Sequence, residues 1–157
     1  MNEKLQDAIP PGATFRHGLR TRFFEVDQHG QVHNAYFLVY AEQAITEFLK
    51  ACDCGDLIVP GADGCIYVVA RSQVDYLKAV GFDADLSLAV WVSRFGRSSL
   101  TFSVAVCESG GDAGIAALAR VVWVYKDGKT GKSTALQPAL GERLAGAIFE
   151  DKREPAP

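Results

Sequence analysis

The sequence predicts an α+β domain in which a curved antiparallel sheet wraps around one long buried helix. Residues 35–51 contain no proline or glycine and form one predicted helix whose apolar side chains cover most of its circumference. A helix of that kind is normally buried, here by the sheet and on one side by a partner subunit. Residues 65–126 instead alternate between apolar and polar positions in runs separated by turns, which is typical of strands. Strands do not alternate with helices along the chain, so the sequence does not favour a doubly wound sheet.

Length and composition limit the classes of protein to consider. The 157 residues suffice for one domain, over 1–157, and are too few for two ordinary ones. A net charge of -3 argues against a nucleic-acid partner, which needs a broad basic surface. The longest apolar runs are shorter than the roughly 18 residues that span a bilayer, and the polar N-terminus lacks the hydrophobic core of a signal peptide. We expect a cytoplasmic protein with no membrane span.

The four cysteines support the same compartment. Cys52, Cys54, Cys65 and Cys107 fall within or beside the predicted helix and strands, and they do not form the close pairs of a zinc site. Buried free thiols in a reducing environment are the simpler interpretation.

The first half of the chain contains one strand and the helix. Residues 1–16 are expected to form a loosely held arm, and residues 19–26 a strand that stops at an acidic residue and a turn. The helix follows at 35–51. Residues 52–64, rich in Gly, Asp and Pro, are expected to form a loop over the end of the helix that helps to line a pocket.

Four further strands are expected in the second half. Period-two alternation predicts them at 65–77, 86–93, 99–107 and 115–126. In the first, the even-numbered residues from Ile66 to Tyr76 should share one face. The last is apolar on both faces, which favours a central place in the sheet. Pro138 opens a short amphipathic helix, and residues 150–157 are expected to be a solvated tail.

The join between the first strand and the helix has the features of a catalytic site. Asp27 ends the strand, Gly30 lies in the turn, and His33 or Asn34 is placed to cap the helix. A carboxylate therefore lies a few residues ahead of a helix N-terminus. Unpaired backbone N–H groups and the positive end of the helix dipole are exposed there.

This join also carries a resemblance to a known family. The block Asp27-x-x-Gly30-x-Val32-x-Asn34-Ala35, with Phe37, Glu42 and Ala44 beyond it, resembles the signature of hotdog-fold acyl-CoA thioesterases of the 4-hydroxybenzoyl-CoA thioesterase type. The likeness runs from Arg16 to about Lys126, because the strand order and the segments 74–79 and 83–86 also match. Four positions depart from the family pattern: Gln31 replaces His, His33 replaces Asn, Phe37 replaces Tyr and Ala79 replaces Pro. The acid at Asp27 is kept, so the departures concern substrate preference more than reaction type.

The resemblance implies an assembly and a set of site residues. Two subunits would join their sheets edge to edge, as a homodimer or homotetramer, with active sites at the interface. The catalytic carboxylate falls on Asp27 and the amide that polarises the thioester carbonyl near Asn34. His33 would cap the helix or bind near the substrate, and Tyr36, Tyr40 and the 52–64 loop would shape the acyl tunnel. Arg94, Arg97 and Ser98, at a hairpin turn, would bind coenzyme A. No metal and no bound organic cofactor is implied.

These residue types suit thioester hydrolysis. The reaction needs a nucleophile, or a base that activates water, and a donor for the oxyanion. A helix N-terminus supplies that donor, and one such donor is typically worth about 3 kcal/mol of barrier. Partial burial is expected to raise the pKa of Asp27 toward a useful value. Both roles, nucleophile and base, remain open, as does the acyl group and whether the thiol is coenzyme A or a carrier protein.

Simpler interpretations and other functions compete with this one. Asp27 could be an ordinary turn or capping residue, and Arg94 and Arg97 could be solvated charges. His29 and His33 are four residues apart but lie in a turn without a third ligand, so no metal site is expected. The alternative functions are a non-catalytic acyl-CoA binding module and a hotdog hydratase or dehydratase. The second would need a His and acid pair on the helix, and we find no such pair.

Overall fold

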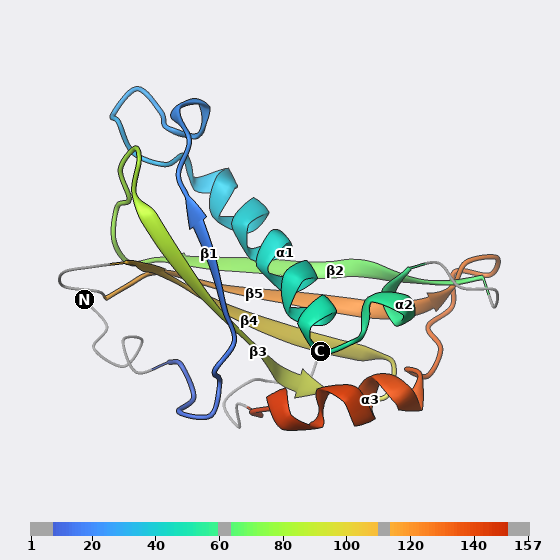
Figure 1. The fold of residues 1–157 in the computed structure, drawn as a ribbon. Helices are drawn as coiled ribbons and strands as arrows, with labels where there is room; N and C mark the ends of the chain where they lie inside the picture. Colours follow the sequence, from blue (N-terminus) through green and yellow to red (C-terminus); the bar gives the residue numbers. More distant parts are fainter. Residues whose placement is uncertain (1–7, 60–63, 110–113, 151–157) are drawn as a thin grey trace.

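The computed structural model describes residues 8–59, 64–109 and 114–150. These residues form a five-stranded antiparallel sheet with α1 (Asn34–Ala51) lying across one face (Figure 1), which confirms the α+β architecture. The strands are β1 (Arg16–Arg20), β2 (Cys65–Tyr76), β3 (Asp85–Phe95), β4 (Ser99–Glu108) and β5 (Ile115–Asp127), in the order β1-β3-β4-β5-β2. The shorter helices are η2 (Phe23–Glu25), α2 (Gly55–Ile58), α3 (Pro138–Leu144) and η3 (Ala145–Ala147).

One face of α1 forms the centre of the core. Its buried side chains pack on the inward-facing residues of β3, β4 and β5, and Phe48 meets Phe102 edge to face at 6.3 Å between ring centroids. The opposite side of the helix is not covered by the protomer, since Val39 is 51% exposed. Within the described residues, no helix is long and apolar enough to cross a membrane.

The first strand differs from the prediction. β1 starts and ends earlier than residues 19–26, and Phe23–Glu25 form a turn of 3-10 helix instead. The reason is local: the Glu25 N–H donates to the Arg22 carbonyl, and the Glu25 carboxylate accepts from the Arg22 N–H at 2.7 Å. Such bonds between side chain and backbone compete with an extended conformation.

The N-terminal arm is also more ordered than expected. Ala13 is 5% exposed and packs with Trp91 and Leu118 in a second cluster of buried apolar residues. Residues 8–15 therefore belong to the folded domain, and only residues 1–7 of the expected arm lie outside the described residues. Most of the expected tail, residues 151–157, lies outside them as well.

β2 is an edge strand with a bulge. Among the described residues it pairs with β5 alone, and β5 lies between β4 and β2, as its two apolar faces predicted. The register shifts between Val69 and Arg71. As a result Tyr67 and Val74 both pack against the main core, although an unbroken alternation would place them on opposite faces. The single face predicted for Ile66 to Tyr76 is therefore wrong.

The ends of β2 and β5 remote from Asp27 are joined by a close backbone contact. The Gly128 N–H donates to the Gly64 carbonyl at 3.0 Å. A Cβ atom on Gly128 would lie 2.4 Å from that same carbonyl oxygen, which is closer than van der Waals contact allows. The two backbone segments can approach this closely only because residue 128 has no side chain.

We expect Gly128→Ala to lower the free energy of unfolding by about 1–3 kcal/mol, because the backbone must shift to admit the methyl group. Urea denaturation measures the effect. Gly146→Ala is the matched control: an added Cβ there meets nothing within 4 Å, so its effect should stay within about 0.5 kcal/mol. Equal effects of the two substitutions would contradict the contact.

Candidate active site

Asp27 lies at the start of a tight turn that precedes α1. Val26 and Val32 form an isolated antiparallel bridge, and the Asp27 N–H donates to the Gln31 carbonyl at 2.8 Å. Gly30 closes the turn with a φ of 71°, in the left-handed region that favours glycine. The turn therefore holds Asp27 beside the residues that lead into the helix.

The Asp27 carboxylate is bound by the backbone of its own turn. Its Oδ1 atom accepts from the His29 N–H at 2.8 Å and the Gln31 N–H at 3.4 Å. The His29 hydrogen bond lowers the pKa of Asp27 below its ordinary value, and this outweighs the opposing effect of desolvation. The expectation that burial raises this pKa is wrong for the protomer. Asp27 is ionised at neutral pH.

The N-terminus of α1 presents one unpaired amide. His33 is the N-cap, as predicted, and its Nδ1 atom accepts from the Ala35 N–H at 3.2 Å. The Tyr36 N–H donates to the His33 carbonyl at 2.9 Å. Among the described residues, the Asn34 N–H has no hydrogen-bond partner, while the Asn34 carbonyl accepts from the Tyr76 hydroxyl at 3.1 Å. The amide at Asn34 is therefore available to a ligand.

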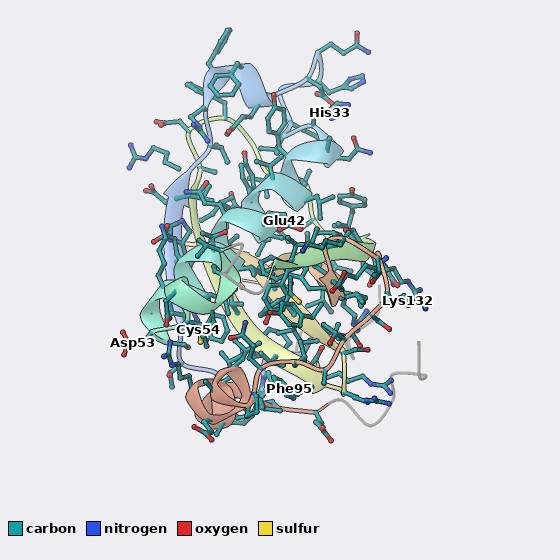
Figure 2. All side chains as sticks on the ribbon, turned by 90° about the vertical axis from the view of Figure 1, so that its right-hand side faces the viewer. His33, Glu42, Asp53, Cys54, Phe95 and Lys132 are labelled. Carbon is teal, nitrogen blue, oxygen red and sulfur yellow. The ribbon has the colours of Figure 1, made fainter. Side chains whose placement is uncertain are left out.

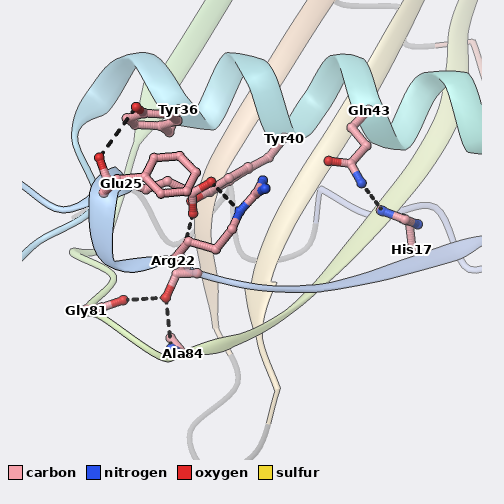
Figure 3. A network of polar contacts seen from close by, with 10 residues as sticks. His17, Arg22, Glu25, Tyr36, Tyr40, Gln43, Gly81 and Ala84 are labelled. Atoms are coloured by element: carbon pink, nitrogen blue, oxygen red, sulfur yellow. Dashed lines mark hydrogen bonds and ion pairs between the residues drawn. The ribbon is translucent and has the colours of Figure 1, made fainter.

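A buried carboxylate supports this end of the molecule, and the sequence analysis missed it. Glu25 is 1% exposed and accepts hydrogen bonds from the Tyr40 hydroxyl at 2.6 Å and from Arg22 Nε at 2.9 Å (Figure 3). The only signal in the sequence is an acid within the apolar run Phe23-Phe24-Glu25-Val26. Nothing in the pattern indicates that its partner is fifteen residues away on α1.

Two expected parts of an acyl tunnel lie elsewhere. Tyr40 is fully buried with its hydroxyl bonded to Glu25, so it lines no open surface. The 52–64 segment begins at the C-terminal end of α1; Figure 2 shows Asp53 and Cys54 at that end and His33 at the other. Part of the expected loop is the short helix α2, and residues 60–63 lie outside the described residues. Cys52, Asp53 and Asp56 do line a pocket, as expected, but at that end of the helix. Tyr36 does lie at the N-terminal end, where its ring packs against Phe24 with centroids 6.2 Å apart.

Arg94, Arg97 and Ser98 are not brought to Asp27 within one protomer. They lie at the turn between β3 and β4, where the Arg97 carbonyl accepts from Leu136 N–H and the Ser98 carbonyl from Tyr125 N–H. β3 runs from the Asp27 end of the sheet to this turn (Figure 1). Its 11 residues cover about 35 Å at the usual strand rise. Within one protomer these three residues therefore lie far from Asp27.

A cavity of about 900 Å³ lies at the same remote end, between the arm, the C-terminus of α1 and η3. Asp56 lines this cavity and forms an ion pair with Arg143 that lowers its pKa, and burial raises the pKa of the Cys52 thiol. The residues that line the cavity do not include Asp27, His33 or Asn34.

Comparisons with solved structures define the fold class. A probable thioesterase from Escherichia coli (YbaW) is 22% identical, with a TM-score of 0.72, covering 85% of this chain and 98% of the other. The 1,4-dihydroxy-2-naphthoyl-CoA thioesterase of Synechocystis is 12% identical, with a TM-score of 0.76 and coverages of 90% and 98%. A Staphylococcus aureus protein in complex with CoA is also 12% identical, with a TM-score of 0.76 and coverages of 91% and 89%. The chain has the hotdog fold.

The family follows from the sequence match. The family model of the thioesterase superfamily matches residues 29–115, which is more than half of the chain. The protein belongs to the thioesterase superfamily. No curated protein sequence matches it.

We expect His33→Ala to lower the free energy of unfolding by about 0.5–2 kcal/mol, because α1 loses the acceptor for the Ala35 N–H. Thermal and urea denaturation measure the loss. His33→Asn keeps a side-chain acceptor at the N-cap and should stay close to the wild type. If both variants lost the same stability, the imidazole would not act as the cap.

Proposed function

We propose that the protein hydrolyses acyl-CoA thioesters to the free acid and the thiol. The observation that carries this proposal is the pairing of two features at one end of α1. Asp27 offers an ionised carboxylate, and the Asn34 N–H, at the positive end of the helix dipole, has no partner within the described residues. Membership of the thioesterase superfamily supports the same reaction.

The proposed roles follow from the charges. The Asn34 N–H donates to the thioester carbonyl oxygen, which gains negative charge as the tetrahedral intermediate forms. Asp27 either takes a proton from the attacking water or attacks the carbonyl carbon itself, giving an anhydride that water then cleaves. In both routes the carbon–sulfur bond breaks and the sulfur leaves with the bonding electrons. In the base route Asp27 returns its proton to the sulfur, and in the nucleophile route the thiolate takes a proton from solvent water. His33 and Tyr36, which precede and follow Asn34 in the chain, would bind the substrate near its thioester carbonyl.

The exposed edge of β2 indicates how a second subunit would contribute. β2 carries exposed apolar side chains, with Ile66 38%, Val69 47% and Tyr76 51% exposed, beside Val39 of α1. A long, apolar, unpaired edge is normally covered by another chain. We therefore propose a homodimer joined through β2, or a homotetramer of two such dimers.

The strand registers support a shared site if two β2 edges pair antiparallel. Ser99 is opposite Val124, and Val124 is opposite Val68, so the β3–β4 turn lies at the Val68 end of β2. The Asp27 site lies at the other end, where Tyr76 bonds to Asn34. A two-fold pairing places the Val68 end of one strand beside the Tyr76 end of the other. Arg94, Arg97 and Ser98 of the partner subunit then lie near this protomer's Asn34.

These groups suit the phosphates of coenzyme A. Guanidinium groups bind phosphate through paired, charge-assisted hydrogen bonds, and a serine hydroxyl adds a donor. The S. aureus relative that was solved in complex with CoA supports coenzyme A as the thiol. A thioester carried by an acyl carrier protein is the alternative substrate. It would contact the same two regions, the Asp27 turn and the β3–β4 turn.

We expect Asp27→Asn to lower the rate of thiol release from acyl-CoA esters by about 100-fold or more, because the base or nucleophile is removed. The substrates would be aromatic, short-chain and long-chain acyl-CoA and one acyl-carrier-protein thioester. Asp83→Asn is the matched control: it removes an exposed carboxylate, 3.6 Å from Arg20, at the same end of the sheet. Turnover by Asp27→Asn at the wild-type rate would exclude Asp27 from the chemistry. Binding of every ester without turnover would favour the non-catalytic module.

We expect activity to reappear when Asp27→Asn and Arg97→Ala subunits are co-expressed. Each mixed dimer would contain one intact site, with Asp27 from one chain and Arg97 from the other. Random pairing then gives about a quarter of the wild-type sites. Thiol release is measured at substrate concentrations below KM, where loss of Arg97 has its full effect. Activity equal to the mean of the two separate variants would contradict a shared site.

A further inference from the structure

The Glu25 carboxylate is the most completely buried acid among the described residues. Burying a carboxylate is costly unless it is paired and hydrogen-bonded. Glu25 meets this requirement with three donors: the Tyr40 hydroxyl at 2.6 Å, the Arg22 N–H at 2.7 Å and Arg22 Nε at 2.9 Å. Burial and the bond to Glu25 raise the pKa of Tyr40, so the phenol stays protonated and remains a donor.

Glu25 connects the segment after β1, the helix α1 and the residue that caps this helix. Its side chain joins the end of β1, through Arg22, to the second turn of α1, through Tyr40 (Figure 3). Its backbone carbonyl accepts from the His33 N–H at 2.8 Å. Residues 25 and 33 are therefore fixed to each other immediately outside the turn that carries Asp27, and residue 33 is the N-cap of α1.

We propose that Glu25 is a positioning residue for the reaction, holding the Asp27 turn at a fixed distance from the Asn34 amide through its bonds to Tyr40 and His33. The inference rests on the proposed thioesterase function. Glu25 is 1% exposed and Tyr40 is fully buried, so neither touches the substrate. Asp27 is two residues beyond Glu25 along the chain, and Asn34 is one residue beyond His33. Any shift of Glu25 relative to α1 changes the distance between the two groups that act on the thioester.

The expected effect is on turnover. Geometry is a large part of catalysis, and a misplacement of about 1 Å can lower the rate about 100-fold. Coenzyme A is expected to bind at the other subunit's β3–β4 turn, which Glu25 does not touch. A positioning role therefore predicts a fall in kcat with little change in KM. A purely structural role predicts a loss of stability without that selective effect.

Tyr40→Phe tests the proposal with the smallest change, because it removes only the hydroxyl that holds Glu25. We expect kcat to fall about 10-fold to 100-fold, with KM within about twofold of the wild type. Glu25→Gln should have a similar or larger effect, because it also weakens the bonds to Arg22. The double variant should be no worse than Glu25→Gln alone, since both changes act on the contact between Glu25 and Tyr40. Ser103→Ala is the matched control. It removes a buried hydroxyl that donates to Ser93 at 3.0 Å in the middle of the sheet.

The outcomes separate the two proposals. If Ser103→Ala keeps its kcat while Tyr40→Phe and Glu25→Gln lose theirs, the positioning role is supported. Wild-type kcat in a folded Tyr40→Phe variant overturns the positioning role and leaves the thioesterase proposal standing. A kcat that falls in Ser103→Ala as much as in Tyr40→Phe also overturns it, because the loss then follows stability alone. If the wild type hydrolyses no thioester, the function itself is wrong and the positioning role is rejected with it.

Discussion

The burial of one face of α1 against the sheet is the constraint on which the other features depend. Phe37, Ala44 and Phe48 fix the rotation of the helix, because each is at most 4% exposed. The first turn of α1 is held in the same way, because Phe37 lies in the main core and the Tyr76 hydroxyl of β2 donates to the Asn34 carbonyl. The polar structure around Glu25 and Asp27 is built on that end of the helix. The position of the Asp27 turn beside the helix N-terminus therefore depends on apolar packing along the whole of α1.

The length of the sheet divides the molecule into two chemically different ends. One end has the acidic turn and the helix amides, and the other has the Arg97 turn, the α3 helix and the cavity beside it. A single copy of the chain cannot fold these ends onto one another, because the strands between them are rigid. The proposed two-fold, antiparallel pairing of β2 would bring opposite ends of two copies together. A ligand with groups far apart, as in the proposed acyl-CoA substrate, could then contact both kinds of group.

Much of the fold could be predicted from the sequence, because its signals are local. The helix at 35–51 and the strands at 86–93, 99–107 and 115–126 follow from periodicity, and the structure reproduces them within a few residues. The 3-10 turn at Phe23–Glu25 could not be predicted, since extended-looking aromatic residues are bent there by one carboxylate. The hydrogen bond between Glu25 and Tyr40 could not be predicted either, because it depends on how α1 packs against a segment fifteen residues away. The direction of the Asp27 pKa shift was missed for the same reason, because it depends on where two backbone N–H groups point.

The extra residue in β2 has a consequence for how the exposed edge behaves. Ala70 interrupts the alternation. Odd-numbered Tyr67 faces the core before it, and even-numbered Val74 faces the core after it. A regular edge can slide by two residues and still present the same face, which allows strands to stack without limit. A bulge instead restricts the register in which the edge can pair, because sliding the strand would move the bulge out of place. One additional alanine therefore opposes unlimited stacking of this edge and the growth of fibrils.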